Sequence, residues 1–198
     1  LVSRYNDEWF EWEAYPADTD GVPVDEAPPA PPSPTEVSLG PLIHTDQTLD
    51  NCGPAAIAEV LRYYGVTKSQ QELQAVLRSN DPSGMETGVI APYARGIGFR
   101  AMVSKGGTAN TVKSLIRNHL PVIVEQLVSS SNSQLHYRAI EGYDEQLHQF
   151  ITADPLLGPR QPVSYAEFDR IWAPTSQTFV VLYPPAKQAT VSAALSQA

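Results

Sequence analysis

Cysteine is nearly absent from this sequence, because its 198 residues include only one, Cys52. A single cysteine excludes an internal disulfide and any zinc site built from several thiolates. Long apolar runs are missing as well, and no stretch approaches the roughly 20 residues that span a bilayer. We therefore expect no membrane contact from this segment, and Cys52 is either an inert buried thiol or a reactive one.

Basic side chains are scarce at the beginning of the chain. Of the 22 acidic and 13 basic residues, nine acids and one arginine lie in residues 1–39, which leaves 13 acids and 12 bases for the rest. The net charge of −9 thus belongs to the first segment. The nearly neutral remainder has no bias toward nucleic acid or anionic lipid, so we predict no nucleic-acid partner.

Composition divides the chain into a tail, one domain and a second tail. Residues 1–39 are acidic and rich in proline, and the part from 17 to 34 is typical of an extended polyproline-type linker. We predict a single domain over 40–185 and a C-terminal tail over 186–198, which is either a loose helix or the start of a truncated element. Because the chain begins at Leu1 rather than methionine, we interpret it as a fragment or a processed form of a larger multidomain chain.

Apolar residues at helical spacing predict four helices in the first part of the domain. Their ranges are 53–64, 69–78, 87–95 and a helix that Thr108 or Asn110 caps and that ends before Pro121. A strand is expected at 99–103, between the third and the fourth helix.

The second part of the domain changes from helical spacing to strand patterns. Strands are predicted at 121–128, 135–143, 148–153 and 178–183, and Ser164 is expected to cap a short helix at 165–172. Because helices precede strands, we predict an α+β fold rather than a doubly wound α/β fold. A helical N-terminal part would pack on a C-terminal antiparallel sheet.

Cys52 stands at the start of the first predicted helix. Gln47 precedes it by five residues, and Gly53 and Pro54 follow it. Proline favours the first helical turn, where its missing N–H costs nothing. Free backbone N–H groups and the helix dipole at such an end favour a thiolate. Taken alone, a lone cysteine is more often a small buried hydrophobe, but this context favours a nucleophile.

A cysteine nucleophile needs a base, and that base needs an orienting partner. The strands at 135–143 and 148–153 flank the turn residues 144–146, which predicts an antiparallel hairpin. Such pairing places His136, at the start of one strand, beside Asp154, at the end of the other. A carboxylate beside an imidazole fixes its tautomer and stabilises the imidazolium.

The other polar candidates have weaker support. His44 lies in an irregular segment without an assigned role, His119 suits a favourable charge at a helix C-terminus, and His148 lies near the hairpin turn. Arg138 shares the strand face of His136 by two-residue alternation. We expect it to form a structural salt bridge with an acidic residue or to contact a substrate carboxylate.

Several sequence blocks, in order, resemble papain-like cysteine peptidases of the bacteriocin-leader-processing type, especially the stand-alone relatives that lack a transporter. The blocks are Gln47 with Cys52-Gly-Pro-Ala-Ala, Leu120-Pro-Val-Ile-Val, His136-Tyr with Glu141-Gly-Tyr-Asp, Ala153-Asp-Pro, and Val163-Ser-Tyr with Phe168 and Trp172. The resemblance covers roughly residues 42–183. It implies a papain-like peptidase fold.

The resemblance also implies a catalytic set for a cysteine-type peptidase, a hydrolase. Cys52 would be the nucleophile, His136 the base and Asp154 its orienting partner. The Gln47 side chain and the Cys52 backbone N–H would form the oxyanion hole. The implied substrate is a peptide or protein, with no cofactor and no metal. Because Gln47 lies one residue closer to the cysteine than in transporter-linked members, the stand-alone, often extracytoplasmic relatives fit better.

Two other functions remain open at this point. The same triad also suits an acyltransferase or amidase that acts on a non-protein substrate. A catalytically silent peptide-binding module would keep the fold without turnover. In addition, the acidic, aromatic segment at the N-terminus could lie across the cleft as a regulatory strand.

Overall fold

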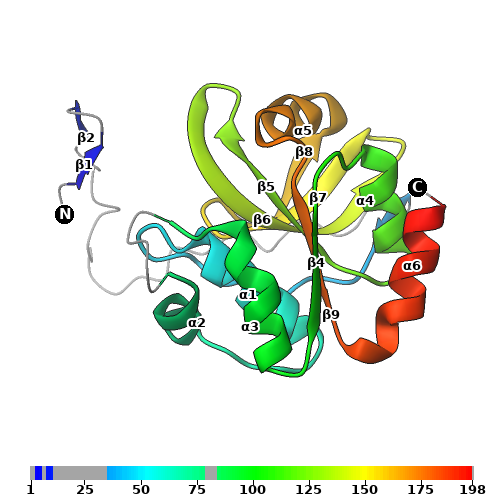
Figure 1. Ribbon diagram of the computed structural model, residues 1–198. Helices are drawn as coiled ribbons and strands as arrows, with labels where there is room; N and C mark the ends of the chain where they lie inside the picture. Colours follow the sequence, from blue (N-terminus) through cyan, green and yellow to red (C-terminus); the bar gives the residue numbers. More distant parts are fainter. Residues whose placement is uncertain (1–2, 6–7, 11–34, 79–83, 198) are drawn as a thin grey trace, which may run out of the picture.

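A seven-stranded sheet, in which neighbouring strands run antiparallel, forms the centre of the fold (Figure 1). The computed structural model describes residues 3–5, 8–10, 35–78 and 84–197. Within these residues the sheet order is β4-β9-β5-β6-β7-β8, and β3 pairs with β6. The strands are β3 (Glu36–Ser38), β4 (Arg100–Ser104), β5 (Val122–Ser129), β6 (Asn132–Asp144), β7 (Gln149–Asp154), β8 (Gly158–Ser164) and β9 (Phe179–Tyr183).

Helices cover both faces of this sheet. One face carries α1 (Cys52–Tyr63), α2 (Gln70–Leu77), the short turn η1 (Thr87–Val89) and α3 (Ile90–Gly96). The other carries α4 (Ala109–Arg117), α5 (Tyr165–Trp172) and α6 (Gln188–Ser196), with short turns η2 (Ala173–Thr175) and η3 (Pro185–Lys187) beside β9.

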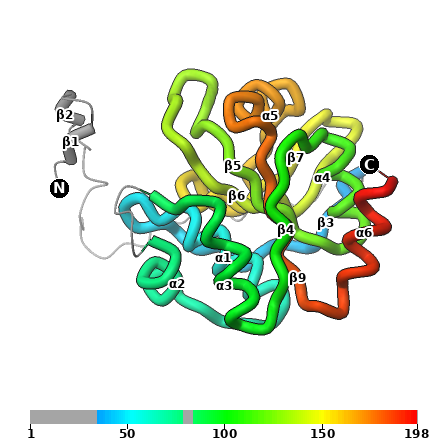
Figure 2. The backbone as a smooth tube through the Cα atoms, viewed as in Figure 1, coloured from blue at the N-terminus to red at the C-terminus, as the bar shows by residue number. Residues whose placement is uncertain are grey.

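The alternation of side chains along the strands creates two apolar clusters. On β5, Ile123 packs with α1 and α3, whereas Val122 and Val124 pack with α4 and α5. Strand side chains point to opposite faces in turn, so one apolar run serves both clusters. Figure 2 traces the same arrangement, with α4 and α6 side by side, and Ser114 of α4 donates to the Ala194 carbonyl at 2.7 Å.

The α+β prediction is confirmed, and the predicted helices and strands match the structure within about two residues at most ends. The caps explain why: Ser164 accepts from the Glu167 N–H at 3.2 Å, and Thr108, one of two predicted candidates, accepts from Thr111 at 3.1 Å. These side chains satisfy N–H groups that the first helical turn leaves free. The final stretch forms α6, whose Val191 and Ala194 are buried in the second cluster.

Two strands of the seven-stranded sheet were not predicted, nor were the two strands near the N-terminus. β8 contains Pro159 and Pro162, which suppress a strand pattern, and it lies at the edge of the sheet, where proline is tolerated. β3 is only three residues long, and its partner on β6 is about a hundred residues away. Near the N-terminus, β1 (Ser3–Tyr5) and β2 (Glu8–Phe10) pair antiparallel with each other. The predicted linker at 17–34 lies outside the described residues.

Candidate active site

Cys52 is the first residue of α1, one position earlier than the sequence pattern predicts for the helix start. Its predecessor Asn51 does not cap the helix with its side chain. Instead, Asn51 donates to Thr48 at 2.6 Å and to Gln74 at 2.8 Å, and accepts from Arg78 at 2.5 Å. This network, buried at Asn51 and Arg78, fixes the start of α1 against α2. It leaves the helix N–H groups at Cys52 available for a negative charge.

Gly53 allows another element to approach the start of α1 closely. A Cβ atom at Gly53 would lie 2.5 Å from Cε of Met85, so the Met85 side chain fills the space that a larger residue would take. Met85 in turn accepts a hydrogen bond at its carbonyl from the Tyr137 hydroxyl at 3.1 Å. Tyr137 follows His136 on β6. The residues next to Cys52 and next to His136 are therefore joined through Met85.

His136 and Asp154 are in direct contact, which confirms the neighbourhood that the predicted hairpin implied. Nε2 of His136 lies 2.7 Å from Oδ1 of Asp154, and the two side chains are 2% and 1% exposed. The Cys52 side chain lies close enough to the imidazole to favour its protonated form. Burial lowers the pKa of His136, but the hydrogen bonds to Asp154 and Cys52 raise it above its usual value.

Hydrogen bonds and a nearby cation fix the position of the Asp154 carboxylate. Its Oδ1 also accepts from the N–H groups of Leu156 at 2.9 Å and Leu157 at 3.3 Å. Nε of Arg138 lies 3.2 Å from Oδ2. Burial raises the pKa of this carboxyl, but the hydrogen bond from His136 and the charges of His136 and Arg138 lower it below its usual value. The structural salt bridge expected for Arg138 is thus confirmed, and its partner is Asp154.

Gln47 lies at the same end of the sheet. Its backbone N–H donates to the carbonyl of Pro155, the residue after Asp154, at 2.8 Å. The side-chain Oε1 of Gln47 is buried and has no hydrogen-bond partner among the described residues. The structure thus brings His136 and Asp154 into contact and places the Gln47 backbone beside Pro155, and the catalytic roles of Gln47, Cys52, His136 and Asp154 remain predictions.

A buried acidic residue that the sequence did not single out supports the Gln47 segment. Glu59, fully buried on α1, accepts from the Thr45 N–H at 3.0 Å and lies 3.1 Å from Nδ1 of His44. Burial raises the pKa of Glu59 above its usual value. Burial lowers the pKa of His44, but the carboxylates of Glu59 and Asp46 raise it overall. An acidic residue within a helical pattern is expected to be exposed, so nothing in the sequence indicated this contact.

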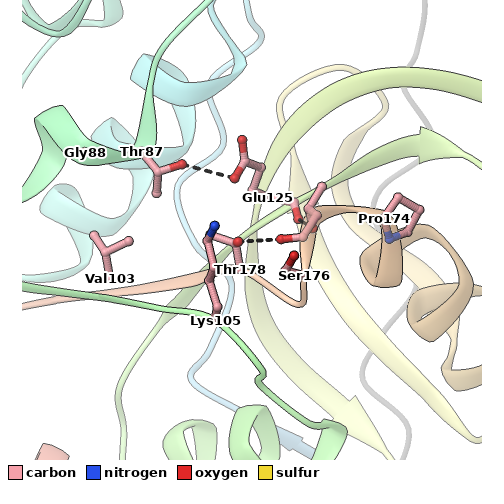
Figure 3. A pocket seen from close by; sticks show the side chains of 9 residues that line it. Thr87, Gly88, Val103, Lys105, Glu125, Pro174, Ser176 and Thr178 are labelled. Atoms are coloured by element: carbon pink, nitrogen blue, oxygen red, sulfur yellow. Dashed lines mark hydrogen bonds between the residues drawn. The ribbon is translucent and has the colours of Figure 1, made fainter.

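A cavity of about 460 Å³ is lined by residues of η1, β4, β5 and η2 and the loops next to them, and not by the four candidate catalytic residues (Figure 3). Hydroxyl groups dominate its lining together with one carboxylate and one ammonium: Thr87, Gly88, Val103, Lys105, Glu125, Pro174, Thr175, Ser176 and Thr178. The Thr87 hydroxyl donates to Glu125 at 3.1 Å and lies 2.7 Å from the Tyr137 hydroxyl, which donates to Glu125 at 3.1 Å. Through Tyr137 the cavity wall is continuous with the strand that carries His136.

The described residues contain no group of three or more His, Cys, Asp or Glu side chains placed to hold a metal ion. Within the same residues, none of the helices is both long and apolar enough to traverse a bilayer. His119 and His148 lie apart from the site: both are exposed and occupy left-handed backbone positions, with φ of 57° and 53°. The former follows α4, where its N–H donates to Ile116 at 3.0 Å.

Solved structures share this fold. A provisionally assigned C39-like peptidase from Bacillus anthracis has a TM-score of 0.63 at 15% identity and covers 74% of this chain and 96% of its own. The peptidase domain of Streptococcus ComA, a bifunctional ABC transporter, has a TM-score of 0.57 at 23% identity over 71% and 96%. A double-glycine-motif protease from an AMS/PCAT transporter, solved with its leader peptide, has 0.58 at 18% over 74% and 94%. The fold is therefore that of papain-like C39 peptidase domains.

A family model described as the Peptidase_C39 like family matches residues 41–180, and the chain belongs to this family. An uncharacterised protein from Methanothermobacter thermautotrophicus is 34% identical over 134 residues, which cover 68% of this chain and 83% of that protein. The resemblance drawn from the sequence blocks is confirmed. Family and fold together suggest a cysteine peptidase.

Proposed function

We propose that this protein is a cysteine peptidase that cleaves peptide bonds with Cys52 as nucleophile, His136 as base and Asp154 as its orienting partner. The observation that carries this proposal is the buried His136 ring, which lies 2.7 Å from the Asp154 carboxylate and has the Cys52 side chain near it. The general arrangement of a thiol peptidase is a nucleophile next to a base, with a carboxylate that orients the base.

In the first half of the reaction, His136 takes the Cys52 proton and the thiolate attacks the carbonyl carbon of the substrate. The oxyanion that forms is stabilised by the Cys52 backbone N–H and the Gln47 side-chain amide. When the C–N bond breaks, the imidazolium of His136 gives its proton to the leaving amine. The acyl group remains on sulfur as a thioester.

In the second half, water replaces the amine. Neutral His136 accepts a proton from the water molecule while the water oxygen attacks the thioester carbon. The C–S bond then breaks, the acid product leaves, and the proton on His136 restores the starting thiol–imidazole pair. We further infer that the cavity beside Tyr137 holds a substrate side chain, and its hydroxyl-rich lining favours a polar one.

The proposal is tested by alkylation, which reports on Cys52 alone because the chain has no other cysteine. We expect iodoacetamide to modify Cys52 of the folded protein at pH 6 at least ten times faster than the same chain in denaturant. His136→Ala should remove this excess, whereas His148→Asn, at an exposed site, should retain it. An equal rate in folded and denatured protein would contradict the proposal.

Cleavage is then measured on a peptide library by mass spectrometry, with Cys52→Ala as the inactive control. We expect hydrolysed products that His136→Ala reduces at least a hundredfold, in line with the usual contribution of a general base. The same assay with added amines detects an acyltransferase, which would form new amides. Tight peptide binding without cleavage at any pH would instead identify a silent binding module.

A further inference from the structure

Arg138 is a buried cation beside the candidate triad, and the triad chemistry proposed above assigns it no role. It is 1% exposed and lies two residues after His136 on β6. Its Nη2 donates to the Val128 carbonyl at 3.0 Å, and its Nε faces Oδ2 of Asp154 at 3.2 Å. A buried guanidinium is costly unless it is paired, so a reason for its position is expected.

The register of the sheet produces this contact. Ala139 of β6 pairs with Ala153 of β7, so the neighbouring positions 138 and 154 face each other across the two strands. Asp154 thereby uses its two oxygens differently. Oδ1 forms hydrogen bonds with the His136 ring and with the backbone N–H groups that follow β7. Oδ2 lies beside the positively charged guanidinium of Arg138.

The pairing has a consequence for the reaction cycle. His136 is positively charged while Cys52 is a thiolate, and neutral once the proton has passed to the leaving group. In the neutral stage, His136 no longer offsets the negative charge of Asp154. Arg138 carries a permanent charge, since its guanidinium does not lose its proton in proteins. It therefore compensates Asp154 at both stages.

We propose that Arg138 is a positioning residue that keeps Asp154 ionised and oriented while His136 changes its protonation state. Arg138 touches neither substrate nor sulfur in this role and acts through Asp154. This inference rests on the proposed roles of Cys52, His136 and Asp154. The charged and titratable groups around the pair are His136 on β6, Cys52 and Glu59 on α1, and Glu167 on α5.

The experiment compares two substitutions at this position in the full chain. Arg138→Gln keeps a side-chain N–H for the Val128 carbonyl but removes the charge, whereas Arg138→Lys keeps the charge but not the planar guanidinium. The readout is the rate of Cys52 alkylation as a function of pH, which needs no peptide substrate. We expect the acid limb of this profile to move up by about one pH unit in Arg138→Gln, as for a carboxylate that loses a close cation. In Arg138→Lys it should stay within a few tenths of the wild type.

A control and a double variant separate the proposed role from a structural one. Arg160→Gln removes another partly buried arginine, paired with Glu36 at 2.7 Å away from the triad, and should lower stability without moving the limb. In an Asp154→Asn background, Arg138→Gln should cause no further shift, because its effect passes through the carboxylate. If Arg138→Gln does not fold, Arg138→Lys still tests the idea, since a limb that moves despite the retained charge contradicts it.

The outcomes also distinguish this inference from the peptidase proposal. A protein that cleaves peptides but whose alkylation profile is unchanged in Arg138→Gln would overturn the role of Arg138 alone. A protein that cleaves no peptide, yet shows the shift and its loss in the Asp154→Asn background, would overturn the peptidase proposal and support the role of Arg138.

Discussion

At the scale of single residues, the buried ionisable groups determine how the folded state responds to pH. His136 and Asp154 are each almost completely removed from solvent, and each is stabilised in its charged form by the other. A group whose pKa differs between folded and unfolded chain links stability to pH. The folded state therefore loses the stabilising contribution of Asp154 at low pH and that of His136 at high pH.

The folded-state pKa of Asp154 lies below that of the unfolded chain, so its contribution is present above the unfolded value of about 3.9 and is lost as the pH falls through the folded value. The folded-state pKa of His136 lies above the unfolded value of about 6.5. Its contribution is complete below that pH and is lost as the pH rises through the folded value.

Because the contribution of His136 is lost as the pH rises, we expect the unfolding free energy of the wild type to fall more between pH 6 and pH 9 than that of His136→Gln. Urea unfolding midpoints at the two pH values measure the difference. Asp154→Ala should be destabilised by about 3–5 kcal/mol at pH 7, because it leaves Arg138 buried without its carboxylate. A wild type and His136→Gln with the same pH dependence would contradict the assignment of a charged His136.

At the scale of secondary-structure elements, two glycines differ in how much space surrounds them. A Cβ atom at Gly107, before α4, would lie 2.6 Å from the ring of Trp172 and 2.8 Å from that of Phe179. Aromatic rings in a packed core cannot move aside easily. Gly96, the last residue of α3, has open space around its Cα instead.

These positions predict opposite results for the same substitution. Gly107→Ala should lower the unfolding free energy by about 1–3 kcal/mol through overpacking. Gly96→Ala should raise it by about 0.5–1 kcal/mol, because alanine restricts the unfolded chain at a position it can adopt. Thermal unfolding of both variants checks this, and a stabilised Gly107→Ala would disprove the packing argument.

The same scale shows how far the sequence predicts this fold. α5 was predicted residue for residue, because its start depends on a local side-chain cap at Ser164. The contact of His136 with Asp154 was predictable because a hairpin brings the start of its first strand near the end of its second, although the register places position 138 directly opposite Asp154. The partner of Arg138 was not identified, since several acidic residues were available and only the assembled sheet selects one. β8 was missed because its prolines mask the strand pattern.

At the scale of the whole molecule, the N-terminal segment offers a test of regulation. The sequence suggested that this acidic, aromatic stretch covers the cleft, and most of it lies outside the described residues. A truncation should end at residue 34, because Thr35 bonds to Asp144 at 2.8 Å and β3 begins at Glu36. Removal of residues 1–34 should increase peptide cleavage if the segment is inhibitory. An unchanged kcat/KM would exclude that role.

The position of β9 has a consequence for the order in which this fold is completed during synthesis. β9 is the last strand in the chain, yet it lies between β4 and β5 and pairs with both. Gln47, Cys52, His136 and Asp154 all precede it by at least 25 positions, Asp154 being followed by β9 only at Phe179. A nascent chain on the ribosome therefore emerges with its complete set of candidate catalytic residues before the strand that joins the two parts of the sheet. If the proposed peptidase function holds, we expect no peptide cleavage by a ribosome-bound chain that ends before β9, and cleavage once synthesis has passed Tyr183.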